Sequence, residues 1–91
     1  MPATIRIPAV LRPAVGGRTQ VPASGTTVGE ALQALVNENP AVREQVFNAD
    51  GSLHRFLNVY VNDDDVRYTG GLDTPVAETD EITLLPAVAG G

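Results

Sequence analysis

The fold is decided by the stretch Thr27-Val28-Gly29-Glu30-Ala31-Leu32-Gln33-Ala34-Leu35-Val36, residues 27–36, which carries the clearest helical pattern in the chain. Threonine followed three residues later by glutamate has the spacing of a capping box, so Thr27 is expected to begin a helix. The apolar residues that follow recur at spacings of three and four, which places them along one stripe of that helix. Asn39-Pro40 ends the helix, because the residue before a proline avoids the helical conformation. The sequence therefore predicts one helix that buries a single face.

Strand patterns lie on both sides of this helix. Residues 4–7 and 18–21, separated by Gly16-Gly17, predict a hairpin with a long connection. Residues 56–61 form the strongest strand pattern, in which Leu57, Val59 and Val61 share one face. A turn at 62–65, a short return strand at 66–68 and a final strand at 81–85 complete the pattern, and a further helical turn is expected around residues 42–47. The expected class is α+β, with a mixed sheet of four to five strands and one main crossing helix.

Composition excludes several kinds of site. The 91 residues contain no cysteine, no lysine and one histidine, His54, so neither a disulfide nor a thiolate zinc site is possible. Residues 1–49 hold four arginines against three glutamates, whereas residues 50–91 hold two arginines against eight acids. This acidic half argues against nucleic acid and favours a basic protein partner. No apolar run approaches the roughly 20 residues of a membrane helix, and no signal peptide is evident, so a cytoplasmic protein is expected.

The end of the chain, Leu84-Leu85-Pro86-Ala87-Val88-Ala89-Gly90-Gly91, carries no charge and no aromatic residue. Glycine has no Cβ, so a Gly-Gly end can enter a passage too narrow for other residues. Pro86 has no backbone N–H and is expected to end the last strand. Six residues, from Pro86 to Gly91, can reach about 20 Å when extended. We therefore expect a globular domain at 1–85 and a flexible tail at 86–91.

A hairpin, one crossing helix, further strands and a Gly-Gly end together resemble the β-grasp, or ubiquitin-like, proteins. Residues 85–91 are similar to the tails of sulfur carriers of the MoaD/ThiS family. Two further segments, Leu53–Leu72 and Ile7–Pro13, resemble the CysO-type branch of that family, which serves cysteine biosynthesis. The resemblance covers most of the chain, although residues 29–50 match only in pattern.

This resemblance implies a carrier that is a co-substrate and not an enzyme. An E1-like adenylyltransferase and sulfurtransferase would use ATP to adenylate the carboxylate of Gly91 and convert it to a thiocarboxylate. A cysteine synthase that uses O-phosphoserine would take the sulfur, and a JAMM-type zinc metalloprotease would release the cysteine. ATP and pyridoxal phosphate belong to these partners, so the chain itself is expected to bind no cofactor, no metal, no nucleic acid and no membrane. Gly90, Ala89 and Val88 would form the narrow part of the tail.

Other candidate sites receive less support from the residues. Leu85, Phe56 and Tyr60 are candidates for a docking patch, because apolar residues on the outer face of a sheet often mark an interface. Ser52 and His54 lack the orienting acid and oxyanion site of a catalytic pair. The run Asp63-Asp64-Asp65 lacks the spacing of a calcium loop and is expected to be a solvated turn.

Three alternative functions remain open at this point. The first is the small, sulfur-carrying subunit of molybdopterin synthase, which would insert a similar tail into a large catalytic subunit. The second is a ubiquitin-like protein conjugation tag, joined through Gly91 to lysines of other proteins. The third is a β-grasp interaction module without any chemistry.

Overall fold

The computed structural model describes residues 3–54 and 57–86. Helix α1, Val28–Glu38, begins at the predicted capping box, and the Thr27 hydroxyl accepts a hydrogen bond from the Glu30 N–H at 3.2 Å. The Glu30 carboxylate accepts in return from the N–H of Thr26, at 2.7 Å. The predicted apolar stripe is buried along its whole length: Val28, Ala31, Leu32, Leu35 and Val36.

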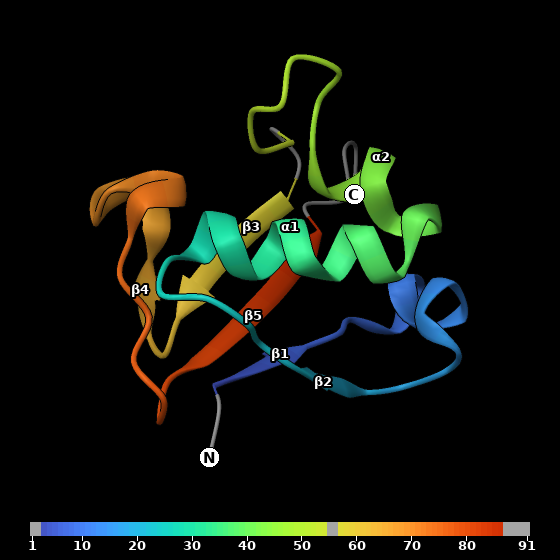
Figure 1. Ribbon diagram of the computed structural model, residues 1–91, viewed down its shortest axis with the longest axis horizontal. Coiled ribbons are helices and arrows are strands. Elements are labelled where there is room, and N and C mark those ends of the chain that lie inside the picture. Colours follow the sequence, from blue (N-terminus) through green and yellow to red (C-terminus); the bar gives the residue numbers. More distant parts are fainter. Residues whose placement is uncertain (1–2, 55–56, 87–91) are drawn as a thin grey trace.

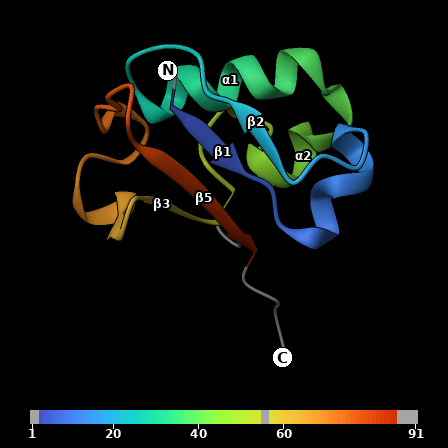
Figure 2. The same cartoon turned by 90° about the horizontal axis from the view of Figure 1, so that it is seen from below.

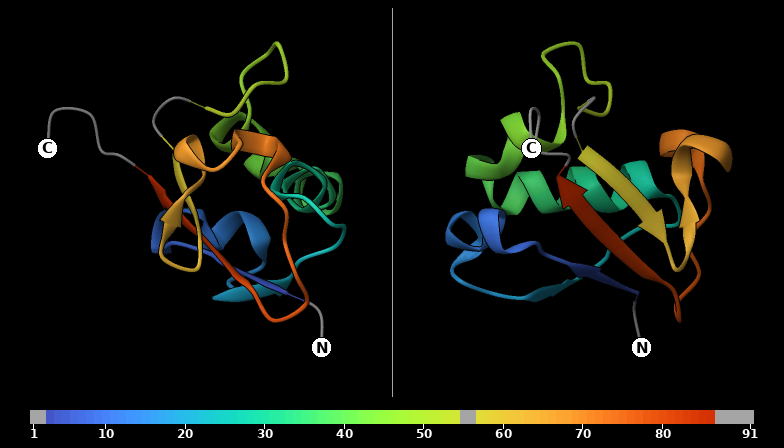
Figure 3. Two further views of the ribbon diagram at one scale, coloured as in Figure 1. Left: turned by 90° about the vertical axis from the view of Figure 1, so that its left-hand side faces the viewer. Right: turned by 180° about the vertical axis from the view of Figure 1, so that it is seen from behind.

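Five strands form one sheet in the order β2-β1-β5-β3-β4. Their bounds are Thr4–Arg6 (β1), Gln20–Pro22 (β2), Leu57–Val61 (β3), Asp64–Asp65 (β4) and Glu81–Pro86 (β5). The β1–β5 pair is parallel and the other three pairs are antiparallel, so the predicted mixed sheet is confirmed. Helix α1 crosses one face of this sheet (Figure 1). Seen from behind, β3 and β5 have no helix over them (Figure 3, right), so the opposite face of these strands is open.

The core lies between α1 and the sheet. Leu57, Val59 and Val61 point into it from β3, as predicted, and Ile82 and Leu84 point into it from β5. The expected helical turn near residue 42 is present as η2, Pro40–Val42, and α2, Arg43–Val46, and it closes one end of the core. Within the described ranges, no helix combines the length and the apolar character that crossing a bilayer requires.

The connection between β1 and β2 holds a helix that the sequence pattern did not predict. It is the 3-10 helix η1, Ala9–Val15, which begins after Pro8 and contains Pro13. It ends at Gly16, whose φ of 72° is the left-handed conformation that favours glycine. Leu11 and Val15 are buried, while Val10, directly before Leu11, is 70% exposed. Figure 2 shows this segment (blue) at the edge of the molecule, on the side of α2.

The predicted return strand at 66–68 is wrong. The strand that pairs with β3 is β4, Asp64–Asp65, and it is joined to β3 by only Asn62 and Asp63. Residues Val66–Tyr68 instead form the 3-10 helix η3, because the Asp65 carboxylate accepts a hydrogen bond from the Arg67 N–H at 2.9 Å and caps it. A further 3-10 turn, η4, spans Gly71–Asp73 and packs against α1.

Candidate functional site: the end of β5

Strand β5 leads directly to the tail and lies in the middle of the sheet. Its first half, Glu81–Thr83, pairs with β1 on one side, and Ile82 and Thr83 also pair with β3 on the other. Its second half, Leu84–Pro86, continues alone against β3, because β1 ends at Arg6. Pro86 is the last paired residue and lies opposite Leu57. The last described residue of the chain is therefore anchored in the sheet.

The tail itself lies outside the described residues. This applies to the predicted thiocarboxylate position Gly91, to Gly90, Ala89 and Val88, and also to Phe56 of the predicted docking patch. Their roles remain predictions. What the structure does establish is the position from which residues 87–91 continue, at the end of a central strand.

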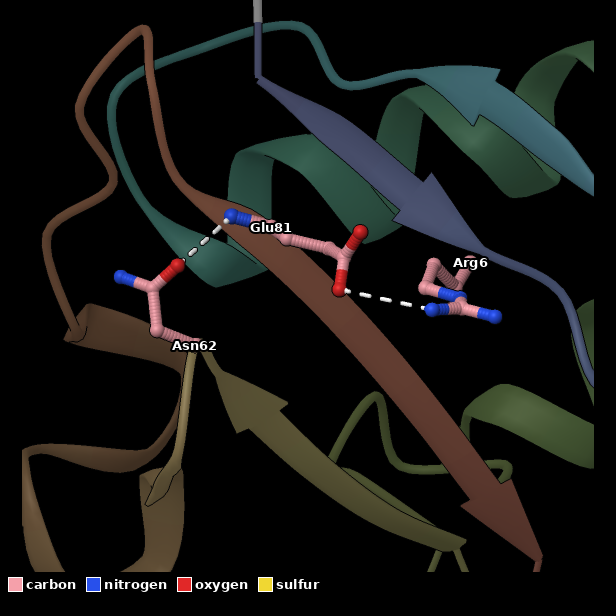
Figure 4. Close-up of polar contacts among 3 residues, drawn as sticks. All are labelled: Arg6, Asn62 and Glu81. Carbon is pink, nitrogen blue, oxygen red and sulfur yellow. Dashed lines mark hydrogen bonds and ion pairs between the residues drawn. The ribbon is translucent and has the colours of Figure 1, made fainter.

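The opposite end of β5 is held by Asn62, as Figure 4 shows. The Glu81 N–H donates to the side-chain oxygen of Asn62 at 3.1 Å, and the Asn62 N–H donates to the Glu81 carbonyl at 2.7 Å. The Asn62 amide group also donates to the Asp80 carboxylate at 3.0 Å. A backbone hydrogen bond from Ala77 and this bond from Asn62 hold the pKa of Asp80 below its ordinary value. Asn62 has a φ of 56°, a conformation that asparagine tolerates better than most residues.

The open face of the sheet carries two of the three predicted docking residues. Leu85 is 48% exposed on β5, and its cross-strand partner on β3 is Asn58. Tyr60, two residues further along β3, is half-buried on the same face, opposite Thr83. Leu85 and Tyr60 are therefore diagonal neighbours on adjacent strands, close enough for a long side chain to span. Their use as a docking patch remains a prediction.

A hollow of about 270 Å³ lies beside the end of β5, on the side of the helices. Its lining comes from η1, α2, β3, β5 and the segment before β3, and consists of Val10, Leu11, Glu44, Gln45, His54, Leu57 and Pro86. The sequence pattern missed this hollow, since Val10 and Leu11 look there like part of a loop. The available signal was the pair Pro8 and Pro13, which bracket these two residues and restrict their backbone.

The remaining candidates have structural roles. The Ser52 hydroxyl donates a hydrogen bond to the Asp50 carboxylate at 2.6 Å, so it does not donate its proton to His54. This bond makes the largest contribution to lowering the pKa of Asp50, and the hydrogen bond from the Ser52 N–H makes the next largest. Asp64 belongs to β4 and Asp65 caps η3, and no cluster of potential metal ligands occurs among residues 3–54 and 57–86.

The architecture defines a class of protein: a β-grasp, ubiquitin-like domain whose central strand continues into the C-terminal tail. The ThiS family model matches residues 5–91, so the chain belongs to the ThiS family. It is 47% identical over 93 aligned positions to the sulfur carrier protein CysO of Mycobacterium tuberculosis, with both chains covered completely. The expected resemblance to the CysO-type carriers is thereby confirmed over the full length.

Solved structures agree. The chain superposes with a TM-score of 0.89 and 44% identity on a chain of the Amycolatopsis orientalis BexX/CysO complex, covering 98% of this chain and 99% of that one. It also resembles small archaeal modifier protein 1 of Methanosarcina acetivorans, with a TM-score of 0.85, 32% identity and coverage of 98% and 95%. The β-grasp fold predicted from the sequence is confirmed, and a relative of this chain is known in a complex with another protein.

Proposed function

We propose that this chain is a sulfur carrier whose C-terminal Gly91 is converted to a thiocarboxylate and donates sulfur for cysteine biosynthesis. The observation that carries the proposal is the extent of the similarity: the ThiS family match runs through residue 91, and CysO aligns over the whole chain. The Gly90-Gly91 end is thus part of the region shared with sulfur carriers, and the chain acts as a co-substrate of other enzymes.

The chemistry requires an activating enzyme, because a free carboxylate is a poor electrophile. A Gly91 carboxylate oxygen would bond to the α-phosphorus of ATP, and pyrophosphate would leave. A sulfur nucleophile would then attack the carbonyl carbon, AMP would leave, and the thiocarboxylate would remain. In the proposed pathway a cysteine synthase that uses O-phosphoserine accepts this sulfur, and a JAMM-type metalloprotease frees the cysteine. The ATP and pyridoxal phosphate are bound by these partner enzymes.

The chain is suited to carry an activated acyl group. It contains no cysteine and no lysine, so no side-chain thiol or amine of its own can capture the acyl adenylate. The root of the tail is fixed, since β5 pairs with β3 up to Pro86. Because Leu84–Pro86 are already held in the sheet, their conformational entropy is not lost when a partner binds the tail.

The destination of the sulfur can be tested by transfer from the charged carrier. The thiocarboxylate form is incubated with cysteine synthase and O-phosphoserine, and in parallel with molybdopterin synthase large subunit and its pterin precursor. We expect a carrier with one added cysteine, detected by intact mass spectrometry, only in the first reaction. Transfer only to the pterin precursor would refute the assignment to cysteine biosynthesis.

The similarity to a small archaeal modifier protein favours one second candidate, a protein conjugation tag. In that case the activated carboxyl of Gly91 would form an isopeptide bond with a lysine of a target protein. Peptide mass spectrometry of tryptic digests of cell extracts distinguishes the two functions, because conjugation would leave residues 68–91, which follow the last arginine, Arg67, attached to the target lysine. The carrier function predicts no such remnant from this chain.

A further inference from the structure

We infer that the hollow at the end of β5 is a second docking site for the activating enzyme, and that it receives an apolar side chain flanked by a basic group. The inference rests on the proposed function, since it assumes an enzyme that handles the tail. We call this hollow, lined by the seven residues named above, the tail-root hollow. It is separate from the open-face patch of Leu85 and Tyr60.

The position of the hollow supplies the first argument. Pro86 lines it, and only five residues follow Pro86. Five residues span at most about 18 Å, so an active site that holds the Gly91 carboxylate lies within that distance of Pro86. Adenylation takes place in a closed site, and the protein that encloses it must therefore cover the surface around Pro86. Figures 1 and 3 show η1 and α2 on this same side of the molecule, beside the end of β5.

The shape and lining of the hollow supply the second argument. Its volume of about 270 Å³ is close to the lower limit of roughly 300 Å³ for small-molecule sites, and it is large enough to admit a side chain of a partner protein. Val10, Leu11, Leu57 and Pro86 provide apolar walls, and Val10 is 70% exposed. Pro8 precedes η1 and Pro13 lies inside it, and both restrict the backbone that presents Val10. A rigid, exposed apolar residue at the rim loses little entropy on docking.

The charge at the rim specifies the partner further. Among the described residues that line the hollow, Glu44, an exposed residue of α2, is the one acidic residue, and none of them is an arginine. A partner side chain that enters the hollow would meet this carboxylate, so a lysine or arginine next to it is favoured. The residues from Leu84 to Gly91 carry no charge, so the tail itself offers no charged group other than its carboxylate for recognition. Contacts with the body of the chain would then contribute to selectivity.

Steady-state charging by the cognate activating enzyme, with ATP and a sulfide source, tests this inference. Val10→Asp should raise the KM for the carrier by about tenfold, corresponding to about 1.4 kcal/mol, with kcat unchanged. The matched control is Tyr68→Asp on η3, which is 87% exposed near β4, at the other end of β3. It should leave KM within about twofold of wild type. An unchanged melting temperature of Val10→Asp shows that the effect is not one of folding.

A charge pair on α2 tests the basic group. Glu44→Arg should raise KM, and the increase should shrink at high salt, whereas Arg43→Glu, whose position does not line the hollow, should not raise it. If the wild-type chain is charged and both Val10→Asp and Glu44→Arg have the same KM as the wild type, this inference is overturned and the proposed function still stands. A wild-type chain that takes up no sulfur would overturn both.

Two other occupants of the tail-root hollow, the chain's own tail and a second copy of the chain, are tested on the carrier without its enzyme. Nuclear Overhauser contacts between the methyl groups of Val10 and Leu11 and protons of residues 87–91 would assign the hollow to the chain's own tail. A dimer in sedimentation experiments that Val10→Asp dissociates would assign it to a second copy. Either result overturns the inference, and we expect a monomer without such contacts.

Discussion

Replacing Asn62 tests how the start of β5 is held. In Asn62→Ala the side chain loses its hydrogen bonds from the Glu81 N–H and to the Asp80 carboxylate; the second is exposed to solvent, so the total cost is about 1 kcal/mol. Alanine must also adopt the φ of 56° that asparagine tolerates, at a further cost of about 1 kcal/mol. The expected loss in the free energy of unfolding is therefore about 2 kcal/mol. For a domain of this size the corresponding fall in melting temperature is roughly 8–16 °C.

Asn62→Gly is the matched control, because glycine also loses these hydrogen bonds but adopts a positive φ without strain. It should lose only about 1 kcal/mol, half the effect of alanine. Urea unfolding of the three proteins, followed by circular dichroism, measures both differences, and equal m values would show that the unfolded states are comparable. Equal stabilities of the alanine and glycine variants would refute the assigned backbone strain. An Asn62→Ala protein as stable as wild type would refute the whole account of this contact.

Three further predictions concern acid, the open face and the tail. Hydrogen bonds lower the pKa of three carboxyl groups in the folded state. The main donors are Thr26 for Glu30, Ser52 for Asp50 and Ala77 for Asp80. These contacts therefore stabilise the fold above about pH 4, and their contribution is lost as the pH falls further. The urea concentration at the unfolding midpoint should decrease when the pH is lowered below about 4, and it should not change because of these groups between pH 5 and 7. Leu85→Asp should raise the KM for charging several-fold with little change in melting temperature, since Leu85 is 48% exposed; an unchanged KM would remove it from the docking patch. Deletion of Gly91 should abolish charging while the melting temperature stays nearly constant, because the core of the described residues, from Ala3 to Leu84, is complete without it. A large loss of stability would contradict this prediction.

Local patterns predicted most of the elements. The capping box and the apolar spacing placed the start and the buried face of α1, because both depend on residues within one or two turns. Alternation in β3 predicted which side chains enter the core. The final strand was expected at 81–85, and the structure extends it by one residue, since Pro86 still pairs with Leu57 although it cannot donate.

The errors arose where a single polar contact or a distant segment decides the structure. Asp65 caps η3 and so converts the expected strand at 66–68 into a 3-10 turn. The connection between residues 7 and 18 was expected without a helix, whereas it holds the 3-10 helix η1, which tolerates Pro13 and exposes Val10. The sequence did not predict the tail-root hollow, because its lining comes from segments that lie far apart in the chain. The period of a strand was enough to place Leu85 and Tyr60 on one face of the sheet, and their role in docking remains a prediction.

The central claim is that Gly91 is activated and carries sulfur. Intact mass spectrometry of the wild-type chain after incubation with its cognate activating enzyme, ATP and a sulfide source tests it most directly. The account predicts replacement of one oxygen by sulfur, located by fragmentation to the C-terminal carboxyl of Gly91. An unchanged mass, under conditions in which the same enzyme charges another carrier, would contradict it.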